Sequence, residues 1–240
     1  MKNILKNKKC FISGATGAVG FELSRLFAKN HCKLFITGRS NSKLININKK
    51  IKSEFPGVKI FFKKCDLPSS HQTERLCKLA LKKLKNIDIL VNCAGVFSIE
   101  DFNQINPKKF DEMFAVNIKA PIIITKKFIK SMKLNKWGRV INIGSSSSYD
   151  GFAKTVLYCS SKHALLGFSR SIHSEYKKFG IKSLFFAPGS IKSNMGKKIK
   201  NQDYNTFLDP KDVANIVLSK LKSNKHLKIT ETKIKRKLYK

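Results

Sequence analysis

The sequence predicts an α/β protein whose parallel sheet is covered by helices on both faces. Six short apolar runs alternate with longer amphipathic stretches of helical length. Strands that alternate with helices are joined by crossover connections, which place neighbouring strands parallel. No Pro/Gly-rich linker, break in composition or internal repeat divides the 240 residues. We therefore expect one doubly wound domain over residues 1–240, with a sheet of about seven strands.

Strands are expected where apolar runs follow one another at regular intervals. They are CFIS at 10–13, KLFIT at 33–37, VKIFF at 58–62, IDILVN at 87–92, RVINIG at 139–144 and IKSLFF at 181–186, with a seventh strand around 229–234. Helical patterns lie between most of these runs, for example at 21–29 and 74–84.

The region after the sixth strand divides into a loose segment and a helix. Residues 190–208 have no clear periodicity, and we interpret them as a substrate lid within the domain. Asp209 can cap a helix whose first position is Pro210, because proline is tolerated there and the aspartate side chain can accept a backbone N–H. The C-terminal part of the domain is therefore expected to contain an irregular segment followed by a regular helix.

Positive charge dominates the composition: 49 Lys and Arg stand against 15 Asp and Glu, a formal net charge of +34. Such an excess suggests a polyanionic partner. It consists almost entirely of lysine, however, whereas phosphate and base recognition favour arginine. AT-rich coding also enriches lysine, together with the Asn, Ile and Phe found here. We keep polyanion or nucleic-acid binding without turnover as an alternative function, but do not expect a nucleic-acid partner.

The six cysteines form no CxxC pair and have no histidine at metal-ligand spacing. They are interpreted as reduced, mostly buried thiols, and no metal site is expected. No apolar segment resembles a signal peptide or approaches the roughly 18 residues of a membrane span. We therefore expect a cytoplasmic protein without a membrane partner.

A glycine-rich turn follows the first predicted strand directly. Residues 13–20 read SGATGAVG and lead into a helical pattern. A tight turn at this junction lets backbone N–H groups at the helix N-terminus face a pyrophosphate, whose charge suits the helix dipole. The context favours a Rossmann-type site for a dinucleotide.

The end of the second predicted strand indicates which dinucleotide the site binds. It reads FITGRS at 35–40, with Arg39 and no carboxylate, whereas sites for unphosphorylated NAD usually place an acidic side chain there to hold the ribose hydroxyls. The basic side chain favours NADP(H), and NAD(H) stays an alternative.

The segment YCSSK at 158–162 places a tyrosine and a lysine four residues apart, so that both project from one face of a helix. A nearby ammonium stabilises a phenolate and lowers the tyrosine pKa from about 10, which suits proton exchange with a carbonyl oxygen. The serines of GSSSS at 144–148 follow the fifth predicted strand, at the sheet edge where doubly wound folds bind ligands. Together these segments predict reduction of a carbonyl or oxidation of an alcohol.

These pieces occur in the order and at the intervals of a known family. The chain resembles the short-chain dehydrogenase/reductases over almost its full length, and in particular their 3-oxoacyl-carrier-protein reductase branch. SGATGAVG resembles the TGxxxGxG cofactor turn, with Ala18 at the middle glycine, and YCSSK is similar to YxxxK. Further similar segments are CDL at 65–67, NCAG at 92–95, FAVNIKAP around Asn117, and APGSIKSNM at 187–195.

The resemblance implies four catalytic residues. Tyr158 donates or accepts the proton, and Lys162 lowers the tyrosine pKa and holds the nicotinamide ribose. Ser145, thirteen residues before Tyr158, orients and polarises the carbonyl, and Asn117 anchors a water-linked proton relay to Lys162. The implied cofactor-binding residues are Gly14, Thr16, Ala18, Val19, Gly20, Arg39, Asp66, Leu67, Asn92, Ala94, Gly95, Tyr158, Lys162, Pro188, Gly189 and Ile191.

The expected function is therefore that of an NADP(H)-dependent oxidoreductase that interconverts a carbonyl and a secondary alcohol. The substrate is expected to be a small molecule, which could also be linked to a carrier protein or a sugar, and small ketones and steroids fit the same catalytic groups. A homo-oligomer is expected. Tyr149, Phe152 and Tyr204 are candidates for the substrate pocket.

Overall fold

Seven parallel strands form one sheet at the centre of the structure, a computed structural model that describes residues 4–200, 202–223 and 229–236. The strands run in the order β3-β2-β1-β4-β5-β6-β7. Their bounds are β1 Lys9–Ser13, β2 Lys33–Gly38, β3 Ile60–Lys64, β4 Ile89–Asn92, β5 Gly138–Ile143, β6 Ile181–Pro188 and β7 Glu231–Ile234. The sheet predicted from the alternating apolar runs is confirmed, including the seventh strand, which pairs with β6.

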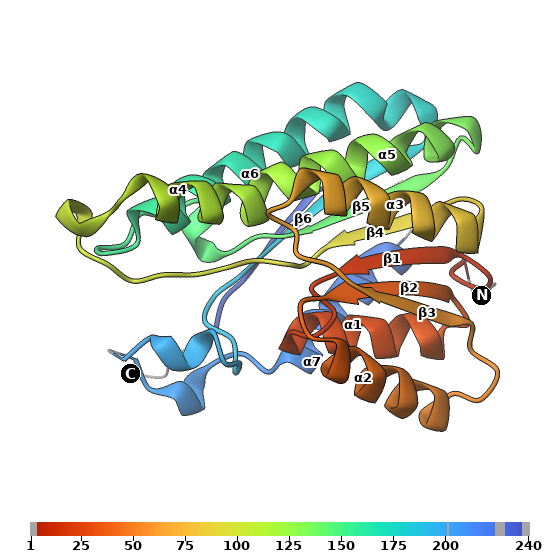
Figure 1. The fold of residues 1–240 in the computed structure, drawn as a ribbon, viewed down its shortest axis with the longest axis horizontal. Helices are drawn as coiled ribbons and strands as arrows, with labels where there is room; N and C mark the ends of the chain where they lie inside the picture. Colours follow the sequence, from red (N-terminus) through yellow and green to blue (C-terminus); the bar gives the residue numbers. More distant parts are fainter. Residues whose placement is uncertain (1–3, 201, 224–228, 237–240) are drawn as a thin grey trace.

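Helices cover both faces of this sheet (Figure 1). One layer consists of α1 Ala18–Lys29, α2 Asn41–Glu54 and α7 Pro210–Lys222, and the other of α3 Ser70–Leu84, α5 Ala120–Leu134 and α6 Val156–Tyr176. The short helix α4 Pro107–Phe114 and the 3-10 turns η5 Gly196–Lys198 and η6 Tyr204–Thr206 lie beyond the carboxyl ends of the central strands.

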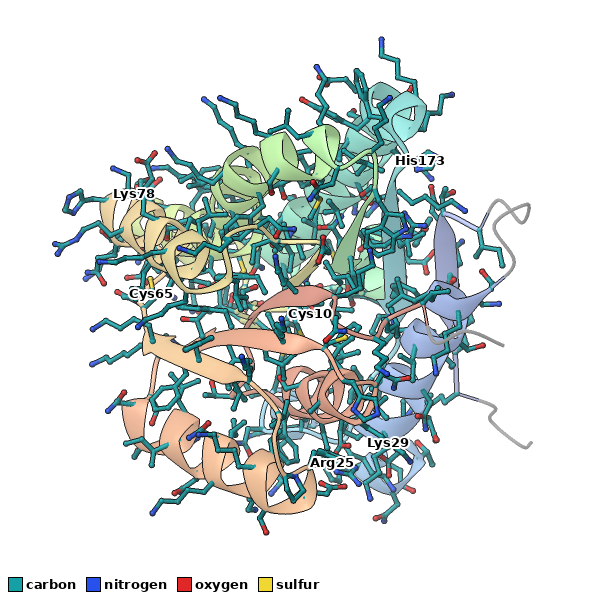
Figure 2. The ribbon with its side chains drawn as sticks, turned by 90° about the vertical axis from the view of Figure 1, so that its right-hand side faces the viewer. Cys10, Arg25, Lys29, Cys65, Lys78 and His173 are labelled. Carbon is teal, nitrogen blue, oxygen red and sulfur yellow. The ribbon has the colours of Figure 1, made fainter. Side chains whose placement is uncertain are left out.

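The central strands are apolar on both faces because each face is covered by helices. All four residues of β4 are buried, and alternate residues of β1 serve different layers. Phe11 stacks with Phe35 at 5.7 Å between ring centroids and packs on Phe128 of α5 at 5.0 Å. Cys10 points into the other layer, and Figure 2 shows it inside the fold. The strand pattern in the sequence therefore encodes two cores, one on each side of the sheet.

Helix boundaries depend on local caps that hydrophobic periodicity does not reveal. The helix expected from residue 74 begins at Ser70, because the Ser69 hydroxyl accepts a hydrogen bond from the Gln72 N–H at 3.3 Å. The cap predicted at Asp209 is confirmed, since its carboxylate accepts from the Lys211 N–H at 2.7 Å. Caps with a side-chain acceptor thus fix where these helices start.

All six cysteines are free thiols, and five of them are buried. Burial raises the pKa of the Cys77 and Cys93 thiols to about 12. No helix within the described ranges is both long and apolar enough to cross a bilayer.

Candidate active site

A cavity of about 1670 Å³ opens at the carboxyl ends of the central strands. Its walls come from the turn after β1, the residues after β2 and β3, the loops after β4 and β5, the start of α6, and residues within 188–200 together with Gln202. β1 and β4 are neighbours in the sheet although they are not consecutive in the chain, so the strand order reverses here, at the position where open α/β sheets bind ligands. The cavity brings together all the predicted site residues except Asn92 and Asn117, which lie beneath its surface.

The turn after β1 is shaped by glycine. Gly14 has a φ of +69°, and a Cβ there would lie 2.6 Å from the backbone of Ala94 in the loop after β4. A Cβ on Gly20 would overlap the carbonyl oxygen of Gly14. The Ser13 hydroxyl ties the two strand ends together by accepting from the Cys93 N–H at 3.2 Å. The two loops therefore approach each other as closely as their backbones allow.

The N-terminus of α1 faces the cavity without a side-chain cap. Its N-cap residue Gly17 has an extended conformation, and Gly17, Ala18 and Val19 line the cavity. Backbone N–H groups in the first turn of a helix have no partner within the helix and carry a partial positive charge. This arrangement fits the diphosphate of a dinucleotide. Ala18 occupies the first helical position and leaves the turn intact.

The end of β2 presents positive charge to the same cavity. Arg39 is exposed and lines the cavity together with Lys43 of α2. Ser40 is engaged as the N-cap of α2, where its hydroxyl accepts from the Lys43 N–H at 3.3 Å. Asp66, after β3, is the one carboxylate among the described residues that line the cavity. The residues at this end fit a dinucleotide with an additional phosphate on its ribose.

Tyr158 and Lys162 lie on the buried face of α6, with 8% and 4% of their surface exposed. The Lys162 ammonium donates to the Ile143 carbonyl at 3.1 Å, and its Nζ lies 5.7 Å from the centre of the Tyr158 ring. Burial lowers the pKa of Lys162 to about 8, although the nearby Cys93 thiol acts in the opposite direction. The ammonium is thus held at the floor of the cavity by the end of β5.

The pKa of Tyr158 differs from the expectation drawn from the tyrosine–lysine spacing. Burial raises it to about 12, and the interaction that lowers it is a hydrogen bond with the Ser145 side chain rather than the Lys162 charge. The Phe97 ring contributes to this burial by packing edge-on against Tyr158, with 4.7 Å between ring centroids. The geometry therefore couples Tyr158 most directly to Ser145.

Ser145 is fixed by the serine-rich segment that follows it. It caps the 3-10 turn η3 Ser146–Ser148, where its hydroxyl accepts from the Ser147 N–H at 3.2 Å. In return, the Ser148 hydroxyl accepts from the Ser145 N–H, also at 3.2 Å. This reciprocal capping box orients the Ser145 side chain toward the tyrosine. The GSSSS run is therefore a local device that positions one hydroxyl.

Asn117 lies in a π-helical turn, η2 Ala115–Lys119, that separates α4 from α5. Its side chain accepts from the Val96 N–H at 2.9 Å and donates to the Val96 carbonyl at 3.0 Å and to the Ser161 hydroxyl at 3.0 Å. A Cβ on the intervening Gly95 would lie 3.4 Å from Asn117 Oδ1 and 3.6 Å from Lys162 Nζ. Asn117 thus joins the loop after β4 to α6 directly below the lysine.

Asn92 has a structural environment rather than a place on the cavity surface. Its side-chain amide donates to Asn142 Oδ1 on β5 at 2.9 Å and to Thr125 Oγ1 on α5 at 3.5 Å. As the last residue of β4 it points into the helix layer, and Cys93, Ala94 and Gly95 form the cavity wall instead.

The aromatic pocket candidates separate into two groups. Phe152 lines the cavity. Tyr149 donates to Glu231 on β7 at 2.6 Å, and Tyr204 packs on Phe207 at 5.2 Å between ring centroids.

Sequence reasoning missed Phe97 and Ser161. The sequence gives a signal only for Ser161, among the small residues of YCSSK. A serine hydroxyl one position before the lysine can reach a neighbouring helix.

The fold and the cavity define a doubly wound protein with a dinucleotide-type glycine turn and a Ser–Tyr–Lys set at the carboxyl edge of its sheet. Residues 8–204 match the family model of the short chain dehydrogenases, and the chain belongs to this family.

Curated relatives span most of the chain. The protein is 31% identical over 222 residues to the 3-oxoacyl-[acyl-carrier-protein] reductase FabG of Rickettsia conorii, covering 89% of this chain and 88% of the relative. It is 26% identical over 233 residues to an uncharacterised oxidoreductase of Staphylococcus saprophyticus, covering 96% of this chain and 98% of that one. Oxidoreductases are therefore the functional class in which these relatives fall.

Solved structures show the same fold. A metagenomic short-chain oxidoreductase in complex with NADP has a TM-score of 0.85 at 24% identity, covering 98% of this chain and 99% of its own. An alcohol dehydrogenase of the archaeon Thermococcus sibiricus, complexed with 5-hydroxy-NADP, has a TM-score of 0.88 at 23% identity, with 98% of both chains covered.

Proposed function

We propose that the protein is an NADP(H)-dependent oxidoreductase that interconverts a carbonyl and a secondary alcohol. One observation carries the proposal: Ser145, Tyr158 and the buried Lys162 line the same cavity as the glycine turn, and the Ser145 side chain lowers the pKa of Tyr158 against the effect of burial. A proton donor, an orienting hydroxyl and a fixed cation face one space that has room for a dinucleotide and a substrate.

The residues present fit NADP(H). The uncapped start of α1 and the close turn at Gly14 suit the diphosphate, while Arg39 and Lys43 suit the ribose phosphate. Two of the similar solved structures contain NADP or a hydroxylated NADP, which supports this choice over NAD(H). When bound, the cofactor supplies or accepts a hydride at the carbonyl carbon. The further residues that would hold it are Thr16, Val19, Gly20, Asp66, Leu67, Ala94, Gly95, Pro188, Gly189 and Ile191.

The chain's own groups handle the proton and the orientation. Tyr158 gives its phenolic proton to the substrate oxygen in the reducing direction and takes it back in the oxidising direction. Ser145 donates to the same oxygen, because its side chain is already aimed at the tyrosine. Lys162 holds the nicotinamide ribose. Asn117 fixes the loop after β4 against α6, next to the Lys162 ammonium.

The test combines cofactor binding with turnover. Purified protein is titrated with NADPH and NADH in parallel at physiological salt, with nicotinamide fluorescence as the readout. NADPH consumption is then followed with small ketones, a sugar ketone and a 3-oxoacyl thioester, the last because a curated relative is named for a carrier-linked substrate. Tight NADPH binding together with turnover of one of these compounds is the expected result. Binding of neither nucleotide would reject the proposal.

The net positive charge of the chain points to a second candidate function, the binding of a polyanion. Lysines occur on both sides of the sheet: in Figure 2, Lys29 on α1 and Lys78 on α3 lie in opposite helix layers. Salt-sensitive binding of RNA without any NADPH turnover would favour a polyanion-binding protein on the same fold.

A further inference from the structure

Three exposed apolar side chains surround the substrate end of the cavity. Ile99, Phe152 and Met195 are 44%, 49% and 36% exposed, and all three line the cavity although they come from three separate segments. When a ligand covers large apolar side chains at an opening, their surface is removed from water, which makes the binding free energy more favourable. This end of the cavity therefore fits a substrate with an apolar body.

The three segments meet around Tyr158. The Glu100 N–H donates to the Lys154 carbonyl at 2.8 Å, which joins the loop after β4 to the loop before α6. Lys198 of η5 donates from Nζ to the Phe97 carbonyl at 3.5 Å, which brings the segment after β6 across the opening. Because the Phe97 ring packs on Tyr158, these contacts surround the proposed reaction centre.

The same opening is cationic. Lys154, Lys198 and Lys200 all line the cavity, and Lys154 alone has a carboxylate partner, Asp101 at 3.0 Å, among the contacts described for these three side chains. Asp66, the carboxylate on the cavity wall, follows β3 at the other end. β3 and β5 are four strand spacings apart, which is about 19 Å at ~4.8 Å per spacing. Lysine charge at the substrate end is thus not neutralised from within the cavity.

We infer that the substrate end of this cavity selects carbonyl compounds that carry an apolar body and a terminal carboxylate. The apolar body covers Ile99, Phe152 and Met195, and the carboxylate lies against Lys198 and Lys200 while Ser145 and Tyr158 hold the carbonyl. This inference rests on the proposed reductase function and adds a substrate class to it.

Matched substrates test the role of the carboxylate. A series of (ω−1)-oxo carboxylates of increasing chain length is compared with the corresponding methyl esters, which keep the carbonyl and the apolar chain but lack the charge. We expect kcat/KM to favour the best carboxylate over its ester by about tenfold, the effect of one charge-assisted contact. The preference should weaken as ionic strength rises.

Matched variants test the residues. Lys198→Gln and Lys200→Gln should each reduce the carboxylate-to-ester ratio of kcat/KM about threefold. Lys197→Gln is the control, because Lys197 belongs to the same exposed 3-10 turn and does not line the cavity. Isothermal titration with octanoate and octanamide gives the same comparison without turnover.

The outcomes separate the two proposals. Equal or better turnover of the esters would overturn the inferred substrate class and leave the reductase function standing. An equal loss in Lys197→Gln and Lys198→Gln would also overturn it, since the effect would then come from the general positive field. No NADPH turnover with either series or with the wider panel of carbonyl compounds would reject the reductase function and the inference with it.

Discussion

The floor and the rim of the cavity are built in different ways. The floor consists of the turn after β1, the buried face of α6 and Asn117, and its polar groups are held by hydrogen bonds to backbone and to one another. The rim consists of the loops at 96–102 and 149–155 and of residues 190–200 and 202, where the described residues form short 3-10 turns and one isolated β-bridge between Ile191 and Leu208. The floor is therefore preorganised for one reaction, whereas the rim can change without disturbing the fold.

This difference has a physical basis. Each floor residue satisfies a constraint from the sheet: Gly14 touches the backbone after β4, and Lys162 bonds the end of β5. A substitution there disturbs packing and chemistry together. Rim residues such as Lys198 make single, solvent-exposed contacts. Perturbations should therefore be large and general on the floor, and small and substrate-dependent on the rim.

The largest effect is expected from Tyr158→Phe, which removes the proton donor and keeps the ring. We expect kcat to fall about 10³-fold, within the range typical of general acid catalysis. NADPH affinity and thermal unfolding should stay near those of the wild type, because the Phe97 contact involves the ring. Steady-state kinetics and NADPH titration measure the two properties separately. Retained turnover would show that another group supplies the proton.

The glycine turn gives the next largest effect. Gly14→Ala places a methyl group 2.6 Å from the Ala94 backbone at a residue with φ of +69°, so both overlap and strain oppose it. We expect a loss of about 3 kcal/mol in the free energy of unfolding, measured in urea, and much weaker NADPH binding.

Gly57→Ala is the matched control for this substitution. Gly57 has a φ of +83° but open space around its Cα, so alanine there adds strain without overlap. We expect about 1 kcal/mol of destabilisation. Equal losses at the two positions would mean that the close approach of the β1 and β4 loops does not constrain the floor.

Arg39→Ser tests the cationic end of the cavity, next to β2. The variant should weaken NADPH binding about tenfold and leave NADH binding unchanged, because only NADPH carries the ribose phosphate. Arg75→Ser, on α3 and away from the cavity, removes the same charge as a control. A parallel loss for both nucleotides would indicate that Arg39 contributes a general positive field rather than phosphate recognition.

The sequence predicts the floor well and the rim poorly. Gly14, Ser145, Tyr158 and Lys162 stand at the ends of strands or one helical turn apart, so strand order and helix geometry bring them together. Two interactions could not be foreseen in this way. The Phe97 ring on Tyr158 and the Lys198 contact to the Phe97 carbonyl depend on how irregular loops fold over the sheet.

Asn92 and Asn117 show a second limit of sequence reasoning. Asn92 ends a strand and Asn117 lies in a helical turn, and for neither does the sequence distinguish a side chain that faces the cavity from one that lies below it. The structure places Asn92 against Asn142 and Asn117 against Val96 and Ser161. Only the direction of each side chain separates a residue of the cavity wall from a residue that supports the wall.

The smallest expected effect concerns Lys162 and pH. Burial lowers its pKa to about 8 from a usual value of 10.5, so between these values the unfolded chain binds the proton more tightly than the folded protein. Stability from this group therefore rises with pH, by about 1 kcal/mol between pH 7 and pH 9.

The Lys162→Met variant lacks the lysine titration. Cysteine thiols that begin to ionise near pH 9 change the unfolding free energy of the wild type and of the variant in the same direction, so their effect cancels in the comparison. The difference in unfolding free energy, wild type minus variant, should therefore increase by about 1 kcal/mol over this range in urea titrations. A constant difference would mean that the lysine is solvated and carries its charge without cost. The floor of the cavity would then be as open to water as its rim, and the contrast between the two regions would lose its electrostatic basis.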